Sequence, residues 1–159
     1  MDPRELRAAF SRFATGVTVV TCRGDEGPHG LTVNSFTSVS LEPPLILISI
    51  DRRANAARYL SGRPFTVNVL TADQEAVAWQ FAGRPQENLA LAWTEGRLSP
   101  RLAEPLAYFE CSPWREYDGG DHVLYVGRVE EFGYSDQAPL LFFASRFARL
   151  PAPGPRSEP

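Results

Sequence analysis

The segment from residue 30 to residue 51 constrains the fold of this chain more than any other. It predicts two strands: residues 31–41 alternate apolar side chains with hydroxyl and amide side chains, and residues 45–50 are continuously apolar. The alternation changes phase once, at Asn34 and Ser35, which is typical of a bulge or bend. Two prolines end the first strand because they cannot donate ladder hydrogen bonds. The second strand has the pattern of a strand buried on both faces.

The polar side chains of the first strand allow two interpretations. They are Thr32, Asn34, Ser35, Thr37, Ser38 and Ser40. In the first interpretation they form the solvent-facing side of an antiparallel strand, which the alternation alone favours. In the second they surround a flat polar ligand, because neutral donors and acceptors orient a heterocycle without burying a charge.

Length and charge narrow the class of protein. A chain of 159 residues can bury a core and is expected to form one domain, and 43% apolar residues indicate a globular protein. The net charge of -3 gives no reason to expect a nucleic acid partner. The longest apolar run is too short to cross a membrane. The first residues lack the apolar core of a signal peptide, so we expect a cytoplasmic protein.

The cysteines and histidines do not have the number or spacing of a metal site. Cys22 and Cys111 fall within predicted strands, without metal-ligand spacing, and are interpreted as buried free thiols. His29 and His122 are the only histidines, which excludes a histidine-rich metal site.

The remaining elements suggest an antiparallel β fold with helices at its edges. Asp2 and Pro3 start a helix that Gly16 ends, and its apolar face is assigned to core or dimer packing. Further helices are predicted before Gly62 and from residue 71 to 82, with a loop over residues 84–98. Further strands are predicted at residues 17–23, 65–70, 107–114, 123–132 and 140–143. About seven strands with hairpin links indicate a barrel or sandwich.

The sequence GLTVNSFTSVSLEPPLILISID of residues 30–51 closely resembles the flavin reductase-like family. These small NAD(P)H:flavin oxidoreductases supply reduced flavin to two-component monooxygenases such as the 4-hydroxyphenylacetate and phenol hydroxylases. The resemblance includes residues 13–21 (FATGVTVVT), 65–70 (FTVNVL), 81–83 (FAG) and 120–122 (GDH), and fades after about residue 150. It implies a mainly β, Greek-key split β-barrel with short flanking helices, which binds FMN or FAD and is usually a homodimer. Residues 1–150 would form this domain, and the proline-rich residues 151–159 a disordered tail.

The same resemblance implies a flavin site. Thr32, Val33, Asn34 and Ser35 would line the edge of the isoalloxazine. The ribityl chain would meet the end of the second strand at Ser49, Ile50 and Asp51.

The resemblance places the flavin phosphate just beyond that strand. The residues are Arg52, Arg53 and Asn55, which are predicted to open a helix, where free N–H groups favour phosphate. From sequence alone, a solvated loop is an equal alternative for the two arginines. Relatives often carry a lysine with hydroxyl residues here, so the side chain that holds the phosphate is left open.

The end of the next helix is also implied in flavin contact, through Phe81, Gly83 and Arg84. The helical spacing of Phe81 favours a core position for its side chain, which makes Gly83 and Arg84 the better contacts.

His122 follows a turn and begins an apolar strand, a position typical of a surface histidine. In the family its imidazole would lie beside the nicotinamide and order NADH or NADPH against the flavin. Near the C-terminus, Arg146 stands where relatives often have an arginine near the active site, although Phe147 replaces the tyrosine that follows it there.

The sequence leaves three functions to compare. The first is an enzyme that reduces FMN or FAD with NADH or NADPH for a separate oxygenase. The second is a flavin-binding protein for storage or electron transfer on the same fold. The third is an oligonucleotide-binding barrel, against which the acidic balance argues. The sequence separates neither FMN from FAD nor NADH from NADPH. It does not show whether flavin stays bound or diffuses as a substrate.

Overall fold

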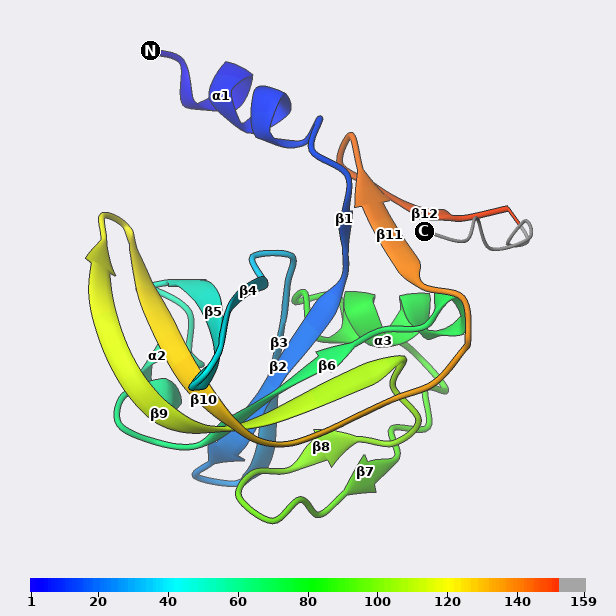
Figure 1. The fold of residues 1–159 in the computed structure, drawn as a ribbon. Coiled ribbons are helices and arrows are strands. Elements are labelled where there is room, and N and C mark those ends of the chain that lie inside the picture. The colour runs from blue at the N-terminus through cyan, green and yellow to red at the C-terminus, as the bar shows by residue number, and fades with distance from the viewer. Residues whose placement is uncertain (152–159) are drawn as a thin grey trace, which may run out of the picture.

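A computed structural model describes residues 1–151 of the chain (Figure 1). The predicted disordered tail, residues 151–159, lies outside the described residues except for Pro151. Among the described residues, no helix has the length and apolar character needed to cross a membrane. The same residues contain no group of three or more His, Cys, Asp or Glu side chains that could hold a metal ion.

A seven-stranded antiparallel sheet forms the centre of the molecule, in the spatial order β3-β2-β6-β9-β10-β5-β4. Its strands are β2 (Thr18–Gly24), β3 (Gly27–Val33), β4 (Thr37–Leu41), β5 (Pro44–Asp51), β6 (Phe65–Val69), β9 (Ala107–Gly119) and β10 (His122–Tyr134). The predicted hairpin near residues 24–28 is confirmed as β2–β3. The protein is therefore mainly β, antiparallel and accompanied by a few short helices.

The predicted bend at Asn34 and Ser35 separates β3 from β4, so the prediction of one strand over residues 31–41 was wrong. The two strands lie at opposite edges of the seven-stranded sheet, although only residues 34–36 connect them. The sheet must therefore curve until its two edges approach one another at the bend. No ladder joins β3 to β4 among the described residues.

Two other strand predictions need correction. Strand β5 is buried on one face only, because Ile46, Ile48 and Ile50 are buried whereas the residues between them are half-buried. Strand β9 was expected to end at Trp114, but it continues to Gly119 and forms a long hairpin with β10.

The chain ends form a second sheet, β1-β11-β12, from Thr15–Gly16, Leu140–Phe143 and Arg146–Arg149. Helix α1 (Pro3–Phe10) starts as predicted, with Asp2 accepting from the Arg4 N–H at 2.8 Å, but it ends before Gly16 because residues 15–16 pair with β11. It buries no residue and projects from the body (Figure 1). Strand β12 and the small β7–β8 pair (Trp93–Thr94 and Arg101–Leu102) were not predicted; both are too short for a periodic signal.

Two hydrophobic clusters hold these parts together. One lies under the seven-stranded sheet and includes Ile48, Phe65 and Val67. The other lies under α3 (Glu75–Gln80) and includes Leu70 and Leu140. A one-turn helix η1 (Ala72–Gln74) precedes α3, and α2 (Ala57–Leu60) follows β5. Cys22 and Cys111 are buried free thiols, as predicted, and burial raises the pKa of Cys22 to about 11.

Residues 96–102 are fastened to the sheet by buried polar side chains. Glu110 accepts hydrogen bonds from the N–H groups of Leu98 and Ser99, and Asn68 accepts from the Leu102 N–H at 3.0 Å. Thr21 donates to the Pro100 carbonyl at 2.5 Å. Gly96 passes so close that an added Cβ would lie 2.2 Å from the Ser99 oxygen, which requires glycine there. We call Thr21, Asn68 and Glu110 the buried clamp.

Candidate functional site

The last residues of β5, from Ile48 to Asp51, have no ladder partner in β4. The ladder between β4 and β5 reaches only Thr37 and Leu47. Beyond it, the Ser35 hydroxyl donates to the Ser49 carbonyl at 2.8 Å and accepts from the Ser49 N–H at 3.0 Å. The bend thus substitutes a side chain for the next rung of the sheet. Past this contact, the strand leads directly to Asp51 and to the turn that follows.

Thr32 ties the end of β3 to the end of α3. Its N–H donates to the Phe81 carbonyl at 3.0 Å, and its hydroxyl donates to the Ala78 carbonyl at 2.6 Å. Phe81 packs over Gly30 and against Trp93, with ring centroids 5.9 Å apart. This is the core position that helical spacing favoured for its side chain. The polar face of the bend is therefore held rigidly before any ligand binds.

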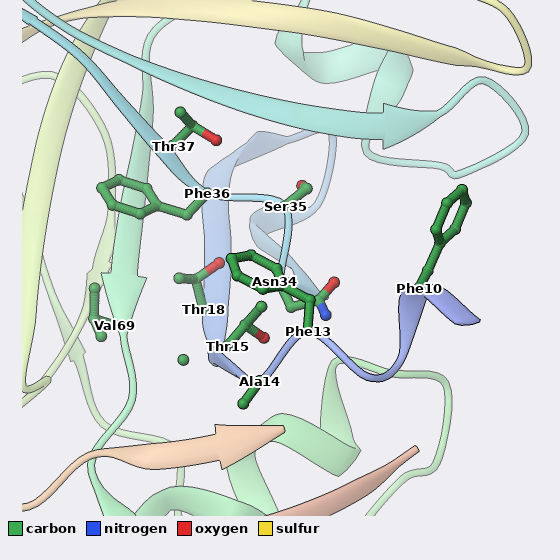
Figure 2. A pocket seen from close by; sticks show the side chains of 11 residues that line it. Phe10, Phe13, Ala14, Thr15, Thr18, Asn34, Ser35, Phe36, Thr37 and Val69 are labelled. Atoms are coloured by element: carbon green, nitrogen blue, oxygen red, sulfur yellow. The ribbon is translucent and has the colours of Figure 1, made fainter. Parts of the chain in front are cut away.

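The largest pocket beside the bend has a volume of about 550 Å³ and is shown in Figure 2. Asn34 and Ser35 line it, as the sequence predicted for a ligand site. Thr37, one of the polar side chains of the ligand-surrounding interpretation, also lines it. Its other lining residues were not predicted for the site: Phe10, Phe13, Ala14, Thr15, Gly16, Thr18, Phe36 and Val69. The apolar face ending in Phe10 and Phe13 had been assigned to packing, and no sequence signal distinguishes that role from a pocket wall.

A second, aromatic pocket of about 210 Å³ also includes Asn34 in its lining. Thr32, Val33 and Asn34 share it with Val17, Trp79, Ala82, Phe142 and Phe147. The rings of Trp79 and Phe147 meet edge to face, with centroids 4.8 Å apart. Trp79 was not predicted for the site, because it lies off the apolar stripe expected for its helix. Asn34 of the bend therefore lines both pockets.

Two predicted residues border this aromatic pocket. Gly83 follows α3 in the left-handed region, at φ +79°. The guanidinium of Arg84 lies 4.5 Å from the ring centroid of Trp79, in a cation–π contact. Arg84 is exposed and holds a positive charge at the rim of an otherwise apolar surface.

A tight turn follows β5. Asp51 accepts from the backbone N–H of Arg53 at 2.8 Å, and from its guanidinium at 3.1 Å (Nε) and 2.8 Å (Nη2). These hydrogen bonds hold the pKa of Asp51 well below its ordinary value. The Arg53 side chain is 87% exposed, so its pairing with Asp51 can be exchanged for another anion.

The helix predicted to open at the two arginines begins later. Residues 52–56 form turns, and α2 starts at Ala57 and is only four residues long. Asn55 lies exposed in these turns, whereas the side chain of Ile50 is buried in the core, so only the backbone of Ile50 can meet a ligand. Residues 52–56 therefore do not offer a helix N-terminus to a phosphate, and Arg53 is exposed in a turn instead.

His122 lies beside this turn. It pairs with Asp51 in the ladder between β10 and β5, and with Gly119 in the β9–β10 ladder. Its Nδ1 is 2.7 Å from Oδ1 of Asp121. Because a carboxylate only accepts, Nδ1 carries the proton in this pair, which leaves Nε2 for a ligand. The half-buried imidazole thus has a fixed tautomer and one free nitrogen.

Arg52 turns away from Arg53 and reaches the β9–β10 turn. Its N–H donates to the Asp121 carbonyl at 3.0 Å, its Nε donates to the Gly120 carbonyl at 2.8 Å, and its Nη2 donates to Asp118. The two adjacent arginines therefore have different partners.

Arg146 lies apart from this cluster. It begins β12, exposed, after a turn whose Ala144 N–H donates to the Ser11 carbonyl at 2.8 Å. In Figure 1 the β11–β12 turn and the β9–β10 turn lie in separate parts of the molecule. Within one chain, Arg146 and His122 are not brought together.

The arrangement suits a long ligand with a flat neutral part and an anionic end. Neutral hydroxyl and amide groups surround the bend, and an exposed arginine and a histidine lie beyond the end of β5. Hydrogen bonds from neutral groups orient a heterocycle, whereas a guanidinium binds phosphate as a charged fork. Within residues 1–151, no serine or cysteine side chain is hydrogen-bonded to a histidine, so the site suits a reaction whose chemistry a bound heterocycle supplies.

Curated proteins with similar sequences are named as flavin reductases. An NADH-dependent flavin reductase of a Rhodococcus species is 40% identical over 165 residues, covering 100% of this chain and 92% of the relative. The reductase component of 4-hydroxyphenylacetate 3-monooxygenase of Thermus thermophilus is 42% identical, covering 91% of this chain and 95% of the relative.

Solved structures agree in fold. The flavin reductase PheA2 superposes with a TM-score of 0.90 at 36% identity, over 95% of this chain and 99% of that one. The NADH:FAD oxidoreductase SgcE6 of Streptomyces globisporus, in complex with NAD and FAD fragments, gives a TM-score of 0.86 at 38% identity, over 96% of each chain. The model of the flavin reductase like domain matches residues 10–151. This chain therefore belongs to the flavin reductase like domain family.

Proposed function

We propose that this protein is an NADH-dependent flavin reductase that reduces FMN or FAD and releases the reduced flavin to a separate oxygenase. The observation that carries the proposal is the open end of β5, between the Ser35–Ser49 contact and the Arg53–His122 cluster. Relatives with similar sequences are named NADH-dependent flavin reductases and monooxygenase reductase components. The bound flavin supplies the redox chemistry, because its ring accepts a hydride from the nicotinamide.

The flavin is proposed to lie along the bend and the end of β5. Thr32, Val33, Asn34 and Ser35 would contact the ring, and Ser49, Ile50 and Asp51 the ribityl chain. Arg53 would hold the phosphate, with Asn55 nearby, while Gly83 and Arg84 would border the far end of the flavin. The residues present fit such a group, because the pocket at the bend is lined by neutral polar atoms and aromatic rings.

NADH is proposed to meet the flavin beside His122. The free Nε2 of the imidazole can hydrogen-bond the nicotinamide carboxamide, and Asp121 fixes the tautomer that permits this. Holding both rings in register makes the transfer effectively intramolecular. Arg146 stays a prediction for nicotinamide contact, since it lies away from His122 within one chain.

We also propose that residues 1–150 form a Greek-key split β-barrel domain that works as a homodimer. Two observations support a dimer: α1 buries no residue, and Phe10 and Phe13 are 69% and 78% exposed. Burying such side chains against a second copy would remove a large apolar area from water. Light scattering of the purified protein would test the dimer. The cytoplasmic location stays a prediction.

The function is tested by mixing the protein with NADH and excess FMN without oxygen and following the flavin absorbance. Catalytic bleaching is expected, and the same assay ranks FAD against FMN and NADPH against NADH. Flavin binding without bleaching by either nicotinamide would overturn the reductase proposal in favour of a flavin-binding protein. Failure to bind flavin would reject both.

A further inference from the structure

We infer that Arg52 is a positioning residue: it holds the β9–β10 turn in place and thereby orients His122 toward NADH. This inference rests on the proposed function, since it concerns the same nicotinamide site. It distinguishes the role of Arg52 from that of Arg53, whereas the family resemblance implies both for the flavin phosphate and leaves open which one holds it.

The contacts of Arg52 all lead to one turn. Its backbone N–H and its Nε bind the carbonyls of Asp121 and Gly120, at 3.0 and 2.8 Å, and its Nη2 binds the Asp118 carboxylate. The same Asp118 oxygen accepts the Gly120 N–H at 3.2 Å. Arg52 therefore crosses from the segment after β5 to both sides of the turn that precedes His122.

The turn needs such support, because its own sequence is flexible. Two glycines stand at its tip, and Gly120 adopts φ +76°, in the left-handed region. The turn residues Asp118, Gly119, Gly120 and Asp121 are all exposed, so packing does not hold them. The carboxylate that fixes the His122 tautomer, Asp121, belongs to this turn. Movement of the turn would therefore move both the imidazole and its partner.

Arg53 has a different environment. It bonds to Asp51 of its own turn and its side chain is 87% exposed, whereas the Arg52 side chain is 46% exposed and bonded to a neighbouring hairpin. At Arg53 a phosphate would replace one carboxylate, that of Asp51, which belongs to the same turn. At Arg52 it would have to break the contacts with both Gly120 and Asp118. The geometry thus assigns phosphate to Arg53 and support of the turn to Arg52.

The test compares Arg52→Ala, Asp118→Asn and Arg52→Lys with the wild type. Arg52→Ala and Asp118→Asn are each expected to raise the KM for NADH about threefold, with FMN affinity unchanged, because both loosen the same contact. The double variant is expected to be no worse than either single variant. Arg52→Lys keeps the charge but lacks the fork, and is expected to recover only part of the loss.

Amide hydrogen exchange gives a second measurement that needs no activity. Exchange in a peptide spanning residues 117–123 is expected to rise about threefold or more in Arg52→Ala and in Asp118→Asn, with exchange in β6 unchanged. This pattern would show that the arginine holds the turn rather than the whole fold.

Several results would overturn the inference. If Arg52 acts only by its charge, Asp118→Asn lowers the KM for NADH and Arg52→Lys behaves as the wild type. If Arg52 binds the flavin phosphate, Arg52→Ala weakens FMN more than riboflavin and Asp118→Asn does not raise the KM. If the wild-type protein fails to bleach FMN, the proposed function itself is rejected. Because the variants are compared with an active wild type, this failure is distinct from a failure of the inference about Arg52.

Discussion

The seven-stranded sheet carries two polar clusters that differ in burial and in the groups they bind. The buried clamp of Thr21, Asn68 and Glu110 is 0% exposed and binds backbone groups of residues 98–102. The cluster at the end of β5, which contains Arg53 and His122, is partly or fully exposed and bonds to its own turns. Each cluster includes carboxylates, so residue type alone does not separate them.

The difference lies in what a ligand could replace. A backbone N–H bound by a buried side chain has no alternative partner, and losing that side chain leaves the N–H group unsatisfied. When an exposed arginine such as Arg53 changes its partner, little free energy is lost, because ion pairs at the surface contribute about 0–1 kcal/mol. Substitutions in the clamp should therefore change stability, whereas substitutions at the end of β5 should change binding.

Glu110→Ala, in the buried clamp, is expected to have the largest effect on stability. It leaves the buried N–H groups of Leu98 and Ser99 without an acceptor, so the free energy of unfolding should fall by about 3 kcal/mol. Denaturant unfolding measures this change. FMN affinity of the folded protein should stay within about twofold of the wild type, because the clamp does not touch the proposed site.

Glu110→Gln is the matched control for this variant. It keeps an accepting oxygen for the N–H groups of Leu98 and Ser99, so it should lose less than half as much stability as the alanine variant. A loss below about 1 kcal/mol for Glu110→Ala would contradict the assignment of Glu110 to the clamp.

Arg53→Ala should change binding instead. Loss of a charge-assisted fork to phosphate is expected to weaken FMN about tenfold and riboflavin hardly at all. Fluorescence titration with the two flavins measures the difference, and the free energy of unfolding should stay within about 0.5 kcal/mol of the wild type. Equal weakening of both flavins would mean that another group holds the phosphate.

His122→Ala is expected to have a smaller effect, because a single hydrogen bond is lost rather than a charge-assisted fork. The KM for NADH should rise about fivefold while FMN affinity stays nearly intact. Steady-state kinetics under anaerobic conditions measures this. Unchanged kinetics would remove His122 from the nicotinamide site.

The sequence predicted the end of β5 better than the buried clamp. The phase change at Asn34 and Ser35 is a local signal, and the bend that it predicts exists. The order of Ser49, Asp51 and Arg53 along one strand end also placed them together, since neighbours in sequence stay neighbours in space. No comparable local signal marks the buried clamp, because Glu110 reaches residues 98–99 only through the loop that carries β7 and β8, whose strands have two residues each.

The aromatic residues that line the two pockets could not be predicted from the sequence either, for a different reason. Phe10, Phe13 and Phe142 come from distant parts of the chain, and an aromatic side chain at a core-like spacing has the same pattern whether it faces a core or a ligand. Only the folded structure brings these rings and that of Trp79 beside Asn34.

Asp51→Asn tests the cluster at the end of β5 through the pH dependence of Tm, and it should give the smallest effect. Hydrogen bonds from Arg53 depress the pKa of Asp51 below its ordinary value of 3.8. A depressed folded-state pKa adds stability above the unfolded-state pKa, and this is lost as the pH falls through the folded-state value. The wild type should therefore melt above Asp51→Asn, by on the order of 1 °C, from neutral pH down to about pH 4, and the two Tm values should converge at lower pH. Thermal unfolding between about pH 7 and pH 2 measures this. A difference that grows toward acid would mean that Asp51 is stabilised in its protonated form, and would remove Arg53 as its partner.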